Sequence, residues 1–192
     1  ADSIIYKGDD NKYYEQVGKS DKEITEEIAF DLPNGWSWCR LKDICSIFTG
    51  ATFKKEETVT TKEGVRILRG GNISPFELRI KDDDIFLTKD KVKEDIILKE
   101  NDILTPAVTS LENIGKMVRV NSDMPNTTVG GFVFIIRLYL KNQWLSKYIL
   151  YLLSSPFMID FMKSITNKSG QAFYNIGKER LSTACKLPKL AY

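Results

Sequence analysis

Histidine is absent from this sequence of 192 residues. Its absence excludes Ser-His-Asp and Cys-His catalysis, an imidazole general base and histidine metal ligands. The three cysteines, Cys39, Cys45 and Cys185, also lack the paired spacing that a four-ligand zinc site needs. We therefore expect free thiols in a reducing compartment and no bound metal.

Long apolar runs are missing as well. No stretch reaches the roughly 18 apolar residues that a membrane span needs, and residues 1–4 lack the features of a secretory leader. The sequence therefore predicts a soluble cytoplasmic protein with no membrane partner.

Motifs of the common enzyme classes fail in this chain. Gly18-Lys19-Ser20 ends like a phosphate-binding loop, but Tyr13 stands where the first glycine is required. A dinucleotide fingerprint is absent, and the 6 prolines are isolated, which excludes the double-proline motif of amino-methyltransferases. Asp10-Asn11-Lys12 matches the end of a nuclease motif, but it lies in a turn cluster with no strand around it, so we attribute the match to chance. The acidic run 82–84 is expected to be a solvated loop. We expect no catalytic residue and no cofactor.

Charge is balanced overall but distributed unevenly. The formal net charge is +2, yet residues 1–31 carry 4 lysines and 9 acidic residues, whereas residues 132–192 carry 9 basic and 2 acidic residues. A basic C-terminal third suggests contact with a polyanion, although lysines that serve solubility would give the same pattern.

Hydrophobic periodicity predicts strands first and helices later. Residues 132–139 are apolar on both faces, as in a central strand, and residues 65–69 form a strand that stops at Gly70-Gly71, where we expect positive φ. Apolar residues recur at helical spacing over 144–152. Ser155-Pro156 then opens a second helix, and Asn175 can cap a short helix that runs through Leu181.

These patterns predict the α/β (α+β) class: a single domain with a twisted mixed or antiparallel sheet and C-terminal helices packed on it. Residues 1–31 are expected to form an extended N-terminal arm on the domain of residues 32–192. The stretches 50–64, 105–113 and 167–171 lack a strong period, so we expect them to be loops that carry function.

Several motifs in a fixed order resemble one known family. They are Leu32-Pro33-Asn34-Gly35-Trp36-Ser37-Trp38 with Leu41-Lys42-Asp43-Ile44, Ile67-Leu68-Arg69-Gly70-Gly71-Asn72-Ile73, Glu100-Asn101-Asp102-Ile103-Leu104, Ile114-Gly115-Lys116, Gly170-Gln171-Ala172-Phe173-Tyr174-Asn175-Ile176 and Leu187-Pro188. Together they resemble the target recognition domain of a type I restriction-modification DNA specificity subunit.

This resemblance implies a non-catalytic, sequence-specific DNA-binding domain that reads one half of a bipartite target in double-stranded DNA. It implies separate methyltransferase (M) and restriction (R) subunits as partners, which would bind S-adenosylmethionine and ATP themselves. In the family a second proline and a long helix follow the closing Leu-Pro, whereas Lys189 follows here, so we expect one recognition domain of a two-domain subunit. The alternatives are the recognition domain of a single-chain restriction enzyme-methyltransferase and a protein- or carbohydrate-binding module.

Loops that combine basic and amide side chains are the candidate DNA-binding sites, because cations hold phosphates and amides read base edges. The candidates are Thr52, Lys54, Lys55, Arg69, Asn72, Thr109, Ser110, Asn113, Lys168, Ser169, Gln171, Tyr174 and Asn175. Other roles remain open for five positions, and one of them is Asn175, which can equally cap a helix. Arg69 can pair with a carboxylate, Asn72 can serve a turn, and Lys54 and Lys55 can form a solvated face beside acidic neighbours.

Overall fold

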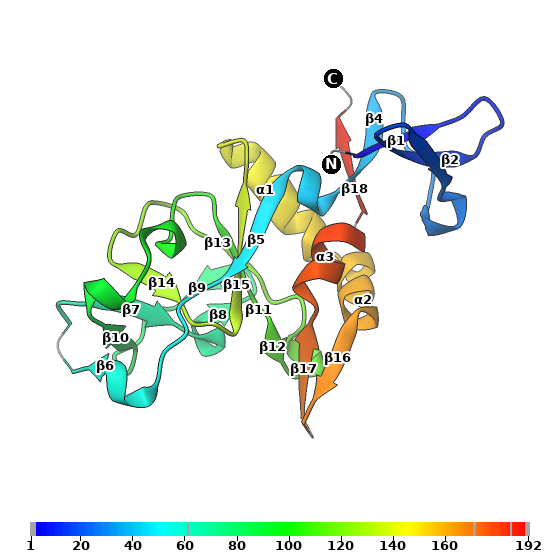
Figure 1. Ribbon diagram of the computed structural model, residues 1–192. Coiled ribbons are helices and arrows are strands. Elements are labelled where there is room, and N and C mark those ends of the chain that lie inside the picture. Colours follow the sequence, from blue (N-terminus) through cyan, green and yellow to red (C-terminus); the bar gives the residue numbers. More distant parts are fainter. Residues whose placement is uncertain (1–2, 61, 171, 185, 191–192) are drawn as a thin grey trace.

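A computed structural model describes residues 3–60, 62–170, 172–184 and 186–190. Short strands form most of the described chain, and its helices lie in the C-terminal part: α1 (Gln143–Leu153), α2 (Pro156–Ser164) and α3 (Lys178–Ala184). The predicted class, strands followed by C-terminal helices, is confirmed (Figure 1). Short 3-10 helices link the strands at Thr25–Glu27, Leu41–Asp43, Lys55–Glu57, Gly70–Asn72, Lys89–Lys91, Glu94–Ile96 and Leu111–Asn113.

The central sheet has the strand order β13-β11-β15-β5. Its strands are β5 (Cys45–Thr49), β11 (Ile103–Pro106), β13 (Val118–Arg119) and β15 (Val133–Leu138). On one face of β15, Phe134, Ile136 and Leu138 pack in a cluster with residues of α1, α2 and α3. On the other face, Val133 and Ile135 pack in a second cluster. The apolar run therefore is a central strand covered on both sides, as predicted.

A second sheet has the strand order β14-β7-β10-β6 and lies at the end of the molecule away from the helices (Figure 1). Its strands are β6 (Thr58–Val59), β7 (Val65–Leu68), β10 (Ile85–Leu87) and β14 (Thr127–Val129). β14 is parallel to β7, whereas the other two pairings are antiparallel, so this sheet is mixed. The hairpin of β8 (Ile73–Ser74) and β9 (Glu77–Leu78) follows β7.

The prediction of positive φ at Gly70-Gly71 is wrong. The residues with positive φ are others, and residues 70–72 instead form one turn of 3-10 helix. Asn72 closes this turn by accepting a hydrogen bond from the backbone of Arg69, which removes the need for a left-handed residue.

The sequence predicts an extended arm over residues 1–31, and the structure has three antiparallel strands there. These are β1 (Ser3–Lys7), β2 (Tyr13–Val17) and β3 (Ser20–Glu23). The buried side chains of Ile5 in β1, Tyr13 in β2 and Ile24, which follows β3, pack with Trp38 of β4 (Trp36–Arg40). β4 itself pairs with β18 (Lys186–Leu190), and the division of the chain at residue 31 stays a prediction.

The first two helices begin where the sequence predicts. Asn142 accepts hydrogen bonds from the first backbone N–H groups of α1, and Ser155 caps α2 with Pro156 in its first turn. The prediction that Asn175 caps a third helix is wrong, because α3 begins at Lys178. Asn175 lies in a strand instead, where pairing with two other strands overrides the local capping signal.

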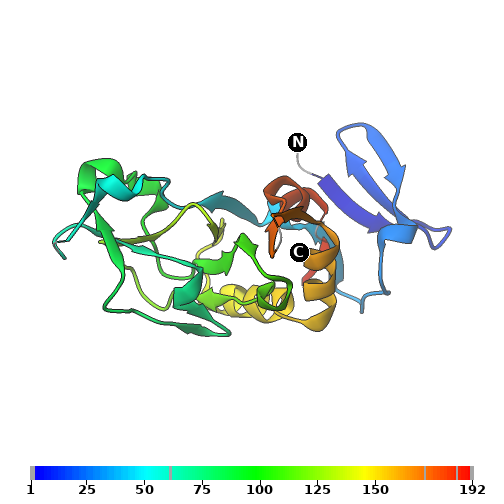
Figure 2. The ribbon, with the colours of Figure 1, turned by 90° about the horizontal axis from the view of Figure 1, so that it is seen from below.

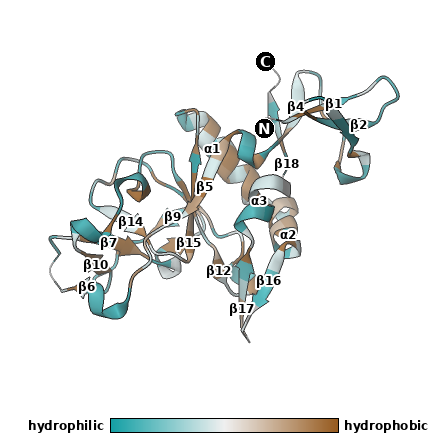
Figure 3. Ribbon diagram, viewed as in Figure 1, coloured by the Kyte–Doolittle hydropathy of each residue, from teal (hydrophilic) through white to brown (hydrophobic). Residues whose placement is uncertain are grey.

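That strand belongs to a third sheet, with the order β12-β17-β16. It consists of β12 (Val108–Thr109), β16 (Thr166–Ser169) and β17 (Phe173–Ile176), all antiparallel. We call the pair β16–β17 the ribbon. Figure 1 shows that it extends from α2 and returns to α3, and Figure 3 shows that β16 is hydrophilic. Figure 2, seen from below, shows the N-terminal strands and the second sheet at opposite ends of the molecule. β12 and most of β16 lie in stretches that the sequence predicts to be loops.

Cys39 and Cys45 are buried free thiols, as predicted, and Cys185 lies outside the described residues. Burial raises the pKa of the Cys39 thiol to about 11 and that of the Cys45 thiol to about 12. Both are therefore inert core residues at neutral pH.

Candidate nucleic-acid interface

Three strands of the central sheet bring their adjoining loops to one edge. β5 and β11 both run antiparallel to β15, so both end where β15 begins. Thr49 of β5 pairs with Phe134, and Pro106 of β11 pairs with Val133. The segments 50–52, 106–108 and 130–132 therefore leave the sheet side by side, and we call them the loop edge.

Backbone hydrogen bonds attach the third sheet to the loop edge. The N–H of Ala107 donates to the carbonyl of Phe132 at 2.8 Å, and the N–H of Ile176 donates to the carbonyl of Ala107 at 2.9 Å. Val108 then pairs with Asn175, and Thr109 pairs with Tyr174. Two predicted binding segments that lie far apart in the sequence thus form one surface.

Contacts at three glycines show how the loops that follow β5 and β7 lie at the loop edge. A Cβ atom on Gly50 would collide with the carbonyl oxygen of Val129, and one on Gly131 would lie 2.9 Å from the hydroxyl of Thr52. A Cβ atom on Gly70 would lie 3.7 Å from the ring of Pro106. Gly50 and Gly131 therefore allow close packing within the loop edge, and Gly70 lies in contact with Pro106, which brings the loop that begins at Arg69 against the loop edge.

Lys54 and Lys55 are exposed at the start of a 3-10 turn. The backbone N–H of Lys54 donates to the carboxylate of Glu57 at 2.7 Å, and Lys91 lies 3.4 Å from the same side chain. These contacts lower the pKa of Glu57, the hydrogen bond from Lys54 having the larger effect. The acidic neighbour thus shapes the turn through the backbone and leaves the two lysine side chains in solvent.

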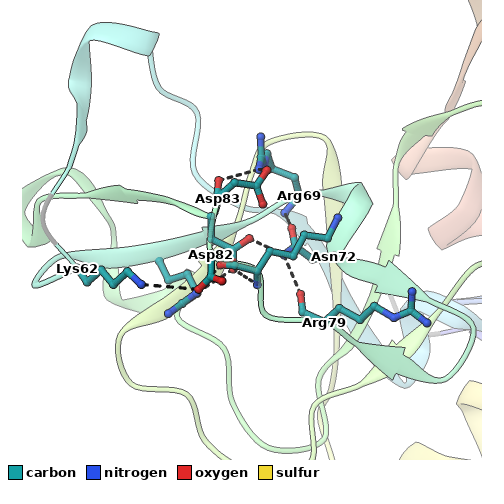
Figure 4. Close-up of polar contacts among 9 residues, drawn as sticks. Lys62, Arg69, Asn72, Arg79, Asp82 and Asp83 are labelled. Atoms are coloured by element: carbon teal, nitrogen blue, oxygen red, sulfur yellow. Dashed lines mark hydrogen bonds and ion pairs between the residues drawn. The ribbon is translucent and has the colours of Figure 1, made fainter.

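Asn72 is buried, with 1% of its surface exposed, and its side chain holds the loop that follows β7. Its oxygen accepts from the backbone of Arg69 at 2.8 Å, and its nitrogen donates to the carbonyl of Arg79 and to Asp84 at 2.8 and 2.6 Å (Figure 4). The side chain therefore has no free group for a base. The geometry favours the turn role that the sequence left open.

Asp84 is the buried anchor of this network. Burial opposes its ionisation, but hydrogen bonds from the backbone of Lys81 and from Asn72 and Arg66 outweigh burial and lower its pKa. Arg69 behaves differently: its guanidinium lies 3.4 Å from the exposed carboxylate of Asp83, and 48% of its side chain is exposed. The same guanidinium donates to the carbonyl of Asp83 at 3.1 Å, and an exposed pair of this kind is weak.

Thr109 ends β12, and Ser110 and Asn113 lie in the turn that follows it. Thr109 is buried, while Ser110 donates to Glu112 at 2.6 Å and accepts from the amide of Asn113 at 2.8 Å. The bond from Ser110 lowers the pKa of Glu112. The contacts of Ser110 and Asn113 hold this turn together where β12 pairs with the ribbon.

The other candidates lie on the ribbon. Lys168 and Asn175 are exposed, and Tyr174 is half-buried against the main core cluster. Ser169 ends β16 and pairs with Phe173 through the backbone. Gln171 lies outside the described residues.

Sequence reasoning missed three exposed residues on this surface. Phe132 at the loop edge is 73% exposed, Phe173 on the ribbon is 55% exposed, and Asn167 of β16 is exposed opposite Asn175. A usable signal existed for the ribbon, because two short stretches flank Gly170-Gln171 as strands flank a hairpin turn.

In sequence, the chain is similar to a curated relative. It is 36% identical over 104 residues to the type I restriction enzyme EcoAI specificity subunit of Escherichia coli, a match that covers 52% of this chain and 17% of the relative. The chain thus spans about a sixth of the length of that protein. No family model matches the chain.

In fold, the chain is similar to two solved structures. One, from work on complex assembly and conformational transition of the type I R-M system, matches 83% of this chain and 35% of its own with a TM-score of 0.55 and 20% identity. The resemblance to specificity subunits is confirmed. The S subunit of a type I system from M. genitalium matches 84% of this chain and 36% of its own, with a TM-score of 0.50 and 19% identity. The fold is therefore that of type I specificity subunits.

Two structural findings bear on other site types. Among the described residues, no group of three or more histidine, cysteine or acidic side chains is placed to hold a metal ion. In the same part of the chain, none of the helices is both long and apolar enough to span a membrane.

Proposed function

We propose that this chain is a non-catalytic, sequence-specific DNA-binding domain of a type I restriction-modification specificity subunit, and that it reads one half of a bipartite target. The observation that carries the proposal is the convergence of four polar segments: the loops that begin at Gly50 and Arg69, the segment 106–113 and the ribbon. A sequence relative that is itself a type I specificity subunit supports this reading over a single-chain restriction enzyme-methyltransferase.

The surface has the two kinds of group that sequence recognition needs. Lys54, Lys55, Arg69 and Lys168 are cations with exposed side chains, suited to phosphates, which fix position without carrying sequence information. Asn175 is an exposed amide on the ribbon, suited to a base edge. We propose the same contact with base edges for Thr52, Ser169, Gln171 and Tyr174. Asn72, Thr109, Ser110 and Asn113 would hold the loops in place around them.

Catalysis in this proposal belongs to partner proteins. The chain would position a methyltransferase subunit and a restriction subunit on DNA, and it would need no cofactor of its own. One structure of similar fold comes from work on assembly of a type I R-M complex, which is the kind of assembly proposed here. Because its substrate would be chromosomal and invading DNA, the protein would work in the cytoplasm.

Salt dependence of DNA binding tests the proposal. Binding of the chain to a random-sequence duplex should weaken steeply as salt rises, with a log–log slope of about −0.9 for each phosphate contact. Fluorescence anisotropy with a labelled duplex, at salt concentrations from about 50 to about 200 mM, measures this slope. A protein- or carbohydrate-binding module would show no salt-dependent affinity for DNA, and that result would refute the proposal.

A further inference from the structure

The ribbon has two faces with different surroundings. Side chains alternate along a strand, so Tyr174 and Ile176 of β17 share one face, and Phe173 and Asn175 share the other. Ile176 is buried in the main core cluster, and Tyr174 packs against the same cluster. The face with Tyr174 and Ile176 therefore points into the protein, and the face with Phe173 and Asn175 points outward.

The outward face presents a pair of amides beside an aromatic ring. Asn167 of β16 and Asn175 of β17 are directly opposite each other in the antiparallel register, and both are exposed. Neither side-chain amide forms a hydrogen bond with another of the residues that the structure describes. Phe173 follows on the same face with 55% of its surface exposed, and half-buried Val108 continues this face on β12.

The tip of the ribbon extends into open space. Gly170 at the turn has a φ of +74°, and no atom lies within 4 Å of the position that a Cβ atom would take there. Between Asp160 and Glu179 the chain carries Lys163, Lys168 and Lys178 and no acidic residue. A polyanion can therefore approach the ribbon without meeting a carboxylate on it.

We propose that the outward face of the ribbon enters the major groove and that Asn167 and Asn175 each hydrogen-bond an adenine in two neighbouring base pairs, with Phe173 against a thymine methyl group. This inference rests on the proposed function, because it names the residues through which that domain reads sequence. The half-site would then contain adjacent A·T pairs where the ribbon lies.

Groove dimensions and side-chain chemistry support this assignment. The major groove of B-DNA is about 12 Å wide and admits a two-stranded ribbon, and an asparagine amide matches the N6 and N7 atoms of adenine. Opposite residues in an antiparallel pair have Cβ atoms about 5 Å apart, which lies between one and two rises of about 3.4 Å, so their amides can reach neighbouring base pairs. Exposed apolar side chains such as Phe173 complement the thymine methyl group. An RNA duplex is disfavoured as the occupant, because its deep, narrow major groove excludes side chains.

Selection from a random duplex library tests the inference. The full chain is used as wild type and as Asn167→Ala and Asn175→Ala, with Asn34→Ala, an exposed asparagine before β4, as the matched control. The wild type and control should enrich one motif with adjacent A·T pairs. Each ribbon variant should lose preference at one of those pairs, with discrimination falling by roughly 5- to 150-fold, the contribution of a bidentate contact.

The salt slope of binding distinguishes the possible failures. All four proteins should show the same slope, because the amides contact no phosphate. If both ribbon variants enrich the wild-type motif with unchanged discrimination, or if the positions they affect hold no adenine, the inference is wrong while the DNA-binding proposal stands. If the wild type shows no salt-dependent binding, the proposed function itself fails and the inference fails with it. Equal thermal melting of the four proteins establishes that the substitutions leave the fold intact.

Discussion

Replacing Glu15 by glutamine should destabilise the protein in a manner that depends on pH. Glu15 of β2 is 8% exposed and faces Arg40 of β4, with Nε–Oε1 and Nη2–Oε2 distances of 2.9 and 2.5 Å. Glu27 lies 3.5 Å from the same guanidinium. The pair joins the N-terminal sheet to the strand that pairs with β18, so its loss loosens the contact between them.

The pKa of Glu15 gives the size of the effect. The hydrogen bonds from Arg40 lower that pKa from 4.5 to about 2. A shift of this size corresponds to about 3 kcal/mol of stability as an upper value. Since the folded pKa lies below the unfolded pKa, this contribution is complete above about pH 4.5 and falls to about half or less at pH 3. Glutamine keeps the shape and loses the charge, so we expect a loss of about 2–3 kcal/mol at pH 7.

Urea unfolding of the wild type and Glu15→Gln at pH 7 and pH 3 measures the difference. The stability gap between the two proteins should narrow at the lower pH, because the wild-type carboxylate becomes protonated there. Glu26→Gln, at an exposed glutamate nearby, serves as control and should change stability by less than about 0.5 kcal/mol. An equal gap at both pH values, or no gap at pH 7, would refute the reasoning.

Three further substitutions test the loops of the candidate interface. Asn72→Ala removes one hydrogen bond to the buried Asp84 and the side-chain partner of two backbone groups, so thermal unfolding should show a loss of about 2–3 kcal/mol; a loss below about 0.5 kcal/mol would contradict the anchoring role. Gly50→Ala places a methyl group against the carbonyl of Val129 and should lower the melting temperature by several degrees, roughly 4 °C or more, whereas an unchanged melting temperature would show that the loop edge is not rigid. Lys168→Ala should weaken binding to all duplexes alike and reduce the salt slope by about 1, and a change confined to one sequence would instead make Lys168 a base reader.

Elements with strong local patterns could be predicted from the sequence. The run at 132–139 is apolar on both faces and becomes β15, and the helical spacing with Ser155-Pro156 becomes α1 and α2. In each case the apolar pattern of one continuous segment determines which side chains are buried, so distant residues add little information.

Elements that depend on distant partners could not be predicted in this way. β12 has two residues and β16 is wholly polar, and each is a strand because β17 pairs with it. The same pairing overrides the helix-cap signal of Asn175 and turns its side chain outward. Local propensity is weak where cross-strand contacts decide the structure.

The candidate site shows the same division. Residue type alone singled out Asn175 and Lys168, which lie exposed on the ribbon, but it could not separate them from Asn72, which lies buried. It also passed over Asn167, because its position opposite Asn175 follows from the register. The loop edge follows from the antiparallel order of β5, β15 and β11, and the ribbon joins it through its pairing with β12; the sequence specifies neither arrangement.

Sequencing of DNA methylation in the host, with the gene intact and deleted, tests the central claim most directly. If this chain reads half of a bipartite target for a methyltransferase, one motif made of two separated halves should lose its methylation when the gene is deleted. Survival of every methylated motif after the deletion, in cells shown to express the protein, would contradict the account.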